Sequence, residues 1–241
     1  MKQLSDRQIK ILDFVIRDYI RYGEPVSSAR VVDALALDAS PATVRNIMQE
    51  LDEDGLLEQL HTSGGRVPTD RAYRYFVDAL MRREDQSPNA RERNMFAELR
   101  RASRHLETAN EDLGRAISEA THAFAILAEF GRDKRLGFHG AQHLLGHGDE
   151  LSDEAVRSFA DMIDNLDEMA SAYREAVGEG ERVFIGRENP YVPARHFSVA
   201  GSRYKCGDSD SVILIIGPKR MDYERGCSIL HYLLEEKNPN E

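Results

Sequence analysis

Arginine and amide side chains gather on one face of the stretch SPATVRNIMQELDEDG, residues 40–55. Its apolar residues Val44, Ile47, Met48 and Leu51 recur at helical spacing, so a helix here buries that stripe and exposes the opposite face. The exposed face and its flanks carry Thr43, Arg45, Asn46 and Gln49. Arginine and amides present paired donors or acceptors that match guanine and adenine edges in a major groove. The pattern therefore predicts a helix that reads bases.

After this segment, the residues HTSGGR predict a tight turn between the short alternating stretch LLEQL and the dipeptide VP. Two glycines allow such a turn and bring backbone N–H groups close to a phosphate, and an arginine at the tip would reach the DNA backbone or a minor groove. The candidate phosphate-contacting residues are His61, Thr62, Ser63, Gly64, Gly65 and Arg66. The alternative is a solvated hairpin turn with no ligand.

The elements that must position these residues have clear start and stop signals. Ser5 and Gln8 form a capping-box pattern, and Gly23 ends the apolar periodicity that follows it. A second, shorter helix is expected after GEPVS. Ser40 then caps a third helix with Pro41 in its first position. Three helices followed by a small hairpin is the order of a winged helix, a variant of the helix-turn-helix.

Composition limits how such a protein would hold nucleic acid. The chain has 241 residues and a formal net charge of −10, and residues 1–75 carry ten Lys or Arg against twelve Asp or Glu. An acidic surface does not grip DNA everywhere, so any contact must be local. No apolar run approaches the ~20 residues that cross a bilayer, and the amphipathic N-terminus is unlike a secretory signal. Two cysteines without a CxxC pair fit a cytoplasmic protein.

The middle of the chain predicts a long helix that ends near residue 130, after a charged linker at 83–90. Leucine and alanine recur there in two heptad rows, which would let a partner helix approach closely. The candidate dimer seam comprises Leu99, Ala102, Leu106, Ala109, Leu113 and Ala116. A helix that packs on its own C-terminal domain fits the same pattern. Both interpretations stay open.

Further along, three histidines stand four residues apart: His139, His143 and His147. On one helix they would align as metal ligands, but Gly140 and Gly146 weaken that helix, so we expect no metal. An acidic amphipathic helix or helix pair follows, and then ERVFIG, HFSVAG and DSVILIIG read as strands. Residues 212–216 are apolar throughout and predict a central strand covered on both faces. A closing helix completes an α+β domain with few strands.

The stretch from Ser40 to Leu80 resembles the signature of the heat-inducible transcription repressor HrcA family. The resemblance extends upstream to LSDRQIKIL and resumes in ENPYVPARHFSVAGSRYKCG and the residues after it. It implies a dimeric repressor that binds an inverted-repeat operator before chaperone genes, with activity supported by a chaperonin. It places Ser40, Thr43, Arg45, Asn46 and Gln49 on the recognition helix and residues 61–66 on the wing. The chain departs from the family at Leu60, Gly64 and Ala72 and is shorter through its middle, where the first part of the expected sheet is not recognisable.

The sequence thus predicts an α+β protein. Residues 1–82 form a winged helix-turn-helix domain, 83–90 a linker, and 91–241 a long linking helix with a reduced GAF-like α/β regulatory domain. The expected partners are double-stranded DNA, a second copy of the chain and a chaperonin, with no cofactor and no membrane. The chain contains no P-loop, GxSxG, HExxH or GxGxxG motif, so an enzyme is not expected. The alternatives are a winged-helix module that binds other proteins, and a regulator that answers to a small molecule.

Overall fold

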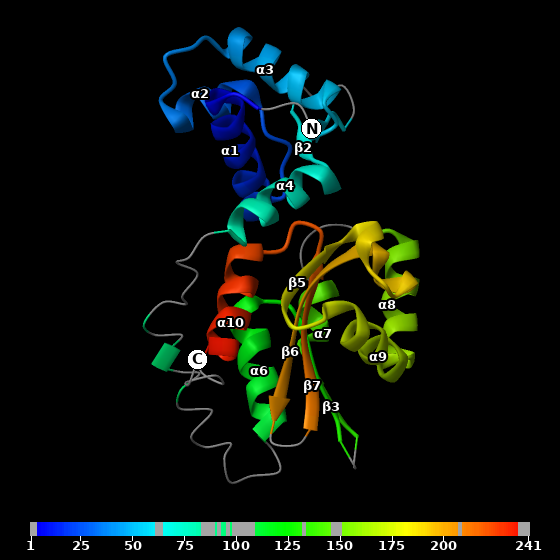
Figure 1. Cartoon of the computed structure of the whole chain (residues 1–241). Coiled ribbons are helices and arrows are strands. Elements are labelled where there is room, and N and C mark those ends of the chain that lie inside the picture. Colours follow the sequence, from blue (N-terminus) through cyan, green and yellow to red (C-terminus); the bar gives the residue numbers. More distant parts are fainter. Residues whose placement is uncertain are drawn as a thin grey trace. The chain divides into compact units, whose positions relative to one another are not determined.

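The chain is described by a computed structural model that covers residues 4–60, 65–82, 90, 93–94, 97, 109–131, 134–145, 151–206 and 209–235. It divides into two compact units, Met1–Arg82 and Arg83–Glu241. The first unit is built mainly of helices and the second around a β-sheet (Figure 1). Each unit has its own core and is described by itself.

The first unit is a winged helix. Its elements are α1 (Asp6–Tyr22), α2 (Ser28–Leu35), α3 (Pro41–Glu53), β1 (Leu57–Glu58), β2 (Val67–Pro68) and α4 (Asp70–Leu80). Strands β1 and β2 pair antiparallel, and an isolated bridge between Val26 and Arg66 adds the α1–α2 connection to this small ladder. Three helices followed by a small hairpin match the predicted winged-helix order.

Side-chain caps start α1 and α3 where the sequence predicts. The backbone N–H of Gln8 donates to Ser5 Oγ at 3.3 Å, and the backbone N–H of Ser5 donates to Gln8 Oε1 at 2.9 Å, which confirms the capping box. Gly23 ends α1 at φ +70°, a left-handed conformation that suits glycine. The N–H of Thr43 donates to Ser40 Oγ at 3.1 Å, so Ser40 is the cap of α3.

Helix α1 forms the centre of the first core, and α2, α3, α4 and β2 contact it. Its buried apolar stripe meets matching stripes on the other helices, and the side chains that are at most 1% exposed include Ile11, Leu12, Val15, Ile16, Val31, Val44, Met48, Leu51 and Val77. Because the stripe of α3 is buried, its remaining side chains are turned outward. The core therefore decides which face of α3 is presented to solvent.

The second unit contains an antiparallel five-stranded sheet in the order β4-β3-β7-β6-β5. Its elements are α6 (Ala109–Thr121), β3 (Phe124–Phe130), β4 (Arg135–His139), α7 (Ala141–Leu145), α8 (Asp153–Asp164), α9 (Leu166–Val177), β5 (Gly180–Ile185), the 3₁₀ helices η1 (Gly186–Glu188) and η2 (Val192–His196), β6 (Phe197–Cys206), β7 (Ser209–Pro218) and α10 (Tyr223–Glu235). The predicted central strand lies within β7, between β3 and β6. The α+β class is confirmed.

Helices cover both faces of this sheet. On one face, α7, α8 and α9 pack over alternate residues of the strands, including Phe124, Ile126, Leu214 and Ile216. Alternation along a strand turns the intervening residues to the other face, where α6 and α10 contact the sheet (Figure 1). This double cover explains why β7 is apolar at every position from Val212 to Ile216.

The predicted helix that ends near residue 130 is wrong in its last part. Helix α6 ends at Thr121, His122 adopts a left-handed φ of +49°, and residues 124–130 form strand β3. The first five residues of β3 are buried, since the strand lies between β4 and β7 and under helices on both faces. A fully buried run has no periodicity that separates helix from strand. The first part of the sheet, unrecognised in the sequence, is β3 with β4.

The candidate dimer seam is affected by the same finding. Leu99, Ala102 and Leu106 lie outside the described residues, and Ala109 is the first residue of α6. Leu113 is half-buried, and Ala116 is only 6% exposed in the single chain, where α6 contacts β3, β4 and α10. Within α6 the pattern is therefore that of a helix packed on its own domain.

Candidate nucleic-acid interface

The outward face of α3 carries the predicted base-reading side chains. Thr43, Arg45, Asn46 and Gln49 are all exposed, as is the cap residue Ser40. Ser40 Oγ and Thr43 Oγ1 lie 3.0 Å apart, and Gln49 Nε2 donates to Glu53 Oε1 at 3.2 Å. Among the described residues, the side chains of Arg45 and Asn46 have no hydrogen-bond or ion-pair partner. These two side chains are available to a ligand without breaking a contact within the chain.

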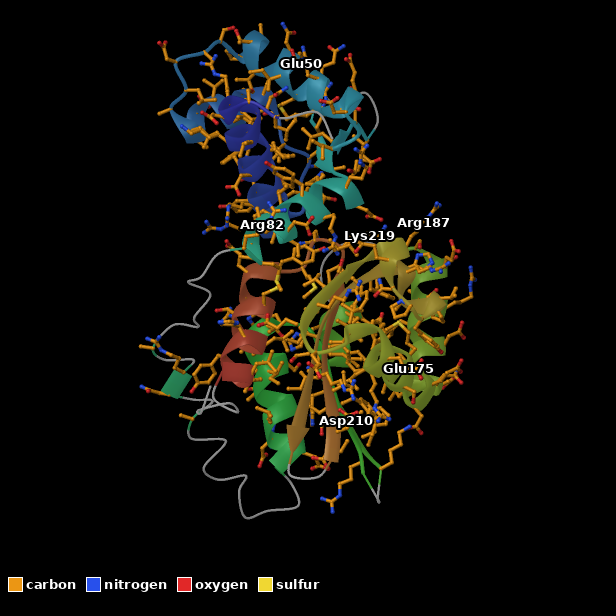
Figure 2. All side chains as sticks on the ribbon, viewed as in Figure 1. Glu50, Arg82, Glu175, Arg187, Asp210 and Lys219 are labelled. Carbon is orange, nitrogen blue, oxygen red and sulfur yellow. The ribbon has the colours of Figure 1, made fainter. Side chains whose placement is uncertain are left out.

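The carboxylates of α3 are held by groups from other parts of the unit. Gln8 Nε2, from α1, donates to Glu50 Oε2 at 3.0 Å, and Figure 2 shows Glu50 on α3. Arg66 Nε donates to Asp52 Oδ2 at 3.0 Å. Acidic side chains near a phosphate backbone would repel it, and these contacts tie both carboxylates to neighbours in the unit. They also fix α3 against α1 and against Gly65 and Arg66, which form the root of the wing.

The wing root is clamped to the α1–α2 connection. The N–H of Val26 donates to the Arg66 carbonyl and the N–H of Arg66 to the Val26 carbonyl, both at 2.9 Å. A Cβ at Gly65 would lie 2.8 Å from Pro25 Cβ and 2.9 Å from the Pro25 backbone carbon and oxygen. Real Cβ atoms do not approach backbone so closely, so the position needs glycine for close packing. Gly65 is buried and does not belong to an exposed tip.

The prediction that Arg66 stands out on the wing tip is wrong. The residue is only 7% exposed, and its guanidinium makes the ion pair with Asp52. A buried guanidinium is stable only with such a partner, because desolvating an unpaired charge is costly. Arg66 therefore joins the wing root to the last turns of α3. His61, Thr62, Ser63 and Gly64 lie outside the described residues.

Sequence reasoning missed these anchoring pairs, although a signal for them was present. A helix predicted to face DNA carries Glu50, Asp52 and Glu53 in its second half. Two of these carboxylates have partners in other parts of the unit. Glu50 accepts a hydrogen bond from the Gln8 amide, and Asp52 forms an ion pair with Arg66, two residues that the sequence assigned to a helix cap and to a phosphate contact.

The histidines of the second unit do not share a helix. His139 ends β4 and His143 lies in α7, while His147 lies outside the described residues. The rings of His122 and His143 meet edge to face with centroids 5.6 Å apart. Among the described residues, no group of three or more His, Cys, Asp or Glu side chains is arranged to hold a metal ion. Nor does any helix of the described part have the length and apolar character needed to cross a bilayer.

The second unit contains two polar clusters of its own, around Asp210 and around Tyr173. Asp210 accepts hydrogen bonds from Arg203 Nε at 2.7 Å and from Arg174 Nε at 2.6 Å. The hydrogen bond from Arg203, followed by that from Arg174, lowers the pKa of the Asp210 carboxyl. Burial raises the pKa of the Tyr173 hydroxyl, which donates to Asn189 Oδ1 at 2.5 Å. Both groups are fully engaged in holding elements of the domain together.

Comparison with known proteins places both units in one family. A family model described as the winged helix-turn-helix transcription repressor, HrcA DNA-binding, matches residues 3–81. The model of the HrcA protein C-terminal domain matches residues 71–226, which is more than half of the chain.

Individual relatives agree with these matches. The heat-inducible transcription repressor HrcA of Symbiobacterium thermophilum is 40% identical over 52% of this chain, a stretch that spans 36% of that protein's length. The repressor of the same name from Chlorobium phaeobacteroides is 24% identical over 96% of this chain and 97% of its own length. A crystal structure described as a hypothetical protein shares the fold, with a TM-score of 0.77, 20% identity and 98% of each chain covered. The chain therefore belongs to the HrcA family of heat-inducible transcription repressors.

Proposed function

We propose that this chain is a sequence-specific repressor of stress genes that binds an inverted-repeat operator as a dimer, with α3 reading bases in the major groove. The observation that carries the proposal is the outward face of α3, where exposed Arg45 and Asn46 have no partner among the described residues. Arginine pairs with guanine O6 and N7, and asparagine with adenine N6 and N7. The family's HrcA relatives support transcriptional repression as the biological role.

The rigidity of α3 supports base reading over a general attraction to DNA. Its cap, its buried stripe and the contacts of Glu50 and Asp52 hold the helix on three sides. A side chain discriminates between bases only when its backbone is fixed in register, and phosphate contacts elsewhere supply that register. The net charge of −10 also favours base reading, because a chain with this charge has little non-specific affinity for DNA.

The decisive variant is Asn46→Ala. We expect it to weaken binding to the preferred operator by about 1–3 kcal/mol and to leave binding to random duplex almost unchanged. The measurement is fluorescence anisotropy with a labelled inverted-repeat duplex and a scrambled duplex, across a salt series. Gln142→Ala is the matched control, since Gln142 is an exposed amide on α7 of the second unit. Equal losses on both duplexes for Asn46→Ala would remove the base-reading role.

The same titration tests the wider proposal. Preference for the inverted repeat with two chains per duplex supports a dimeric repressor. If no preference is seen, the titration is repeated with chaperonin added, since the family resemblance suggests chaperonin-supported activity. Absence of preference in both would favour the alternative, a winged-helix module that binds other proteins.

A further inference from the structure

A second surface of the winged-helix unit has the composition of an interface. An open groove of about 860 Å³ lies between the second half of α1 and α2. Its walls include Phe14, Arg17, Arg21 and Tyr22 of α1, and Arg30 and Asp33 of α2. No α3 residue lines it, so it is separate from the face that we assign to base reading.

Most charges along this groove are neutralised within the chain. Arg17 Nε lies 2.8 Å from Asp13 Oδ2, one turn away on α1. Arg30 reaches from α2 to α1, where its Nε and Nη2 contact the two carboxylate oxygens of Asp18 at 2.7 and 2.8 Å. The two-point contact fixes the guanidinium of Arg30, and the hydrogen bond to Asp18 raises its pKa. These pairs are internal to the unit and leave little charge for a partner.

Two charges of opposite sign remain. Arg21 on α1 and Asp33 on α2 are both exposed, and neither side chain has a hydrogen-bond or ion-pair partner within the described residues. They stand on opposite walls of the groove. A two-fold axis through such a surface brings residue i of one copy to residue j of the other, and j to i. One unpaired cation and one unpaired anion therefore make the groove complementary to itself.

An aromatic side chain of the α1 wall contacts arginines from both helices. Tyr22 is 51% exposed, and the guanidinium carbons of Arg30 and Arg21 lie 4.7 and 5.2 Å from its ring centroid. These cation–π contacts hold the ring in place, so little side-chain entropy is lost when a partner covers it. Tyrosine and arginine are the residue types that most often dominate binding energy at protein interfaces.

We propose that this groove is a two-fold contact between the winged-helix units of two copies of the chain, in which Arg21 of each copy pairs with Asp33 of the other. A nucleic acid fits less well, since Asp18 and Asp33 line the same groove and Asp33 would repel phosphate. The inference rests on the proposed function in one respect, because an inverted repeat is read by two such units side by side.

A charge swap in the full chain tests the pairing. We expect Arg21→Glu and Asp33→Arg, each alone, to raise the dimer dissociation constant roughly tenfold, because each turns two exposed attractions into repulsions. The double variant restores both pairs with reversed sign and should return the constant to within about threefold of the original. Sedimentation velocity without DNA measures all three, and circular dichroism checks that each variant is folded.

Arg157→Glu, an exposed charge reversal on α8, is the matched control and should leave the dissociation constant unchanged. A constant unaffected by both single reversals overturns the proposal, as does a double variant whose loss equals the sum of the single losses. The readout contains no DNA, so it is independent of operator binding. Restoration by the swap without any operator preference would reject only the proposed function. Operator preference without any effect of the reversals would reject only this contact.

Discussion

Two groups of polar side chains, one in each unit, differ in whether they have partners. In the winged helix, Gln8 and Arg66 hold the acidic residues of α3 from outside, and Arg45 and Asn46 are left exposed and without partners among the described residues. In the second unit, Asn189 and Asp210 are satisfied by several donors or acceptors and hold the domain together. Partnered polar groups stabilise a fold, whereas exposed and unpartnered ones on a rigid element are candidates for recognition.

The largest expected effect is a loss of stability when the buried, hydrogen-bonded side chain of Asn189 is removed from the second unit. Asn189 is 1% exposed, and its Nδ2 donates to the carbonyls of Gly186, Ala194 and Phe197 at 2.8, 3.1 and 3.0 Å. Asn189→Ala removes these side-chain hydrogen bonds and leaves the buried Tyr173 hydroxyl without its acceptor, so we expect a loss of about 3 kcal/mol in the free energy of unfolding. Chemical denaturation followed by far-UV circular dichroism measures it. A loss below about 1 kcal/mol would contradict the assigned role.

The next effect concerns the wing root. Gly65→Ala places a Cβ against the Pro25 backbone, so the wing must move away from the α1–α2 connection. We expect about 1–3 kcal/mol of destabilisation, from strain in a packed site, together with weaker operator binding. Thermal unfolding and anisotropy are the two measurements. Gly137→Ala is the control, since its added Cβ meets nothing within 4 Å. Similar behaviour of the two variants would show that the close approach to Pro25 does not matter.

The variant Arg66→Ala tests whether this residue is an internal anchor or a phosphate contact. Arg66→Ala removes the partner of Asp52 and should cost about 1–2 kcal/mol in stability, because Asp52 is one-third exposed and is partly screened. As an anchor, Arg66 should leave the salt dependence of DNA binding unchanged in slope. A phosphate contact would flatten that slope by about one unit when removed. Anisotropy across a salt series distinguishes these results.

The smallest expected effect is a pH dependence confined to the second unit. The pKa of Asp210 is lowered by Arg203 and then by Arg174, so its contribution to stability is full above the unfolded pKa of about 4 and is lost as pH falls through the folded value. Asp210→Asn should therefore be less stable than the unmodified chain at neutral pH, and the difference should shrink toward acid pH. Asp210 lies on β7 (Figure 2). Urea unfolding at several pH values measures the difference in stability. A constant difference would contradict the assignment.

Local signals made the first unit largely readable from the sequence. Capping residues and glycine stops act within one helical turn, so Ser5, Gly23 and Ser40 fixed the helix bounds. Apolar periodicity then identified the exposed face of α3 correctly. The interpretation of Gly65 and Arg66 as parts of an exposed tip was wrong because it depended on neighbours distant in the chain, Pro25 and Asp52.

What the sequence alone determined is therefore the class of the protein, its winged helix and the side chains on the outward face of α3. The tertiary structure decided what periodicity cannot show: that residues 124–130 are a central strand, that Ala116 is buried in its own domain, and that Arg66 is an internal anchor. The physical reason is common to all three. A segment covered on every side, or a charge with a distant partner, takes its state from contacts made after the chain has folded.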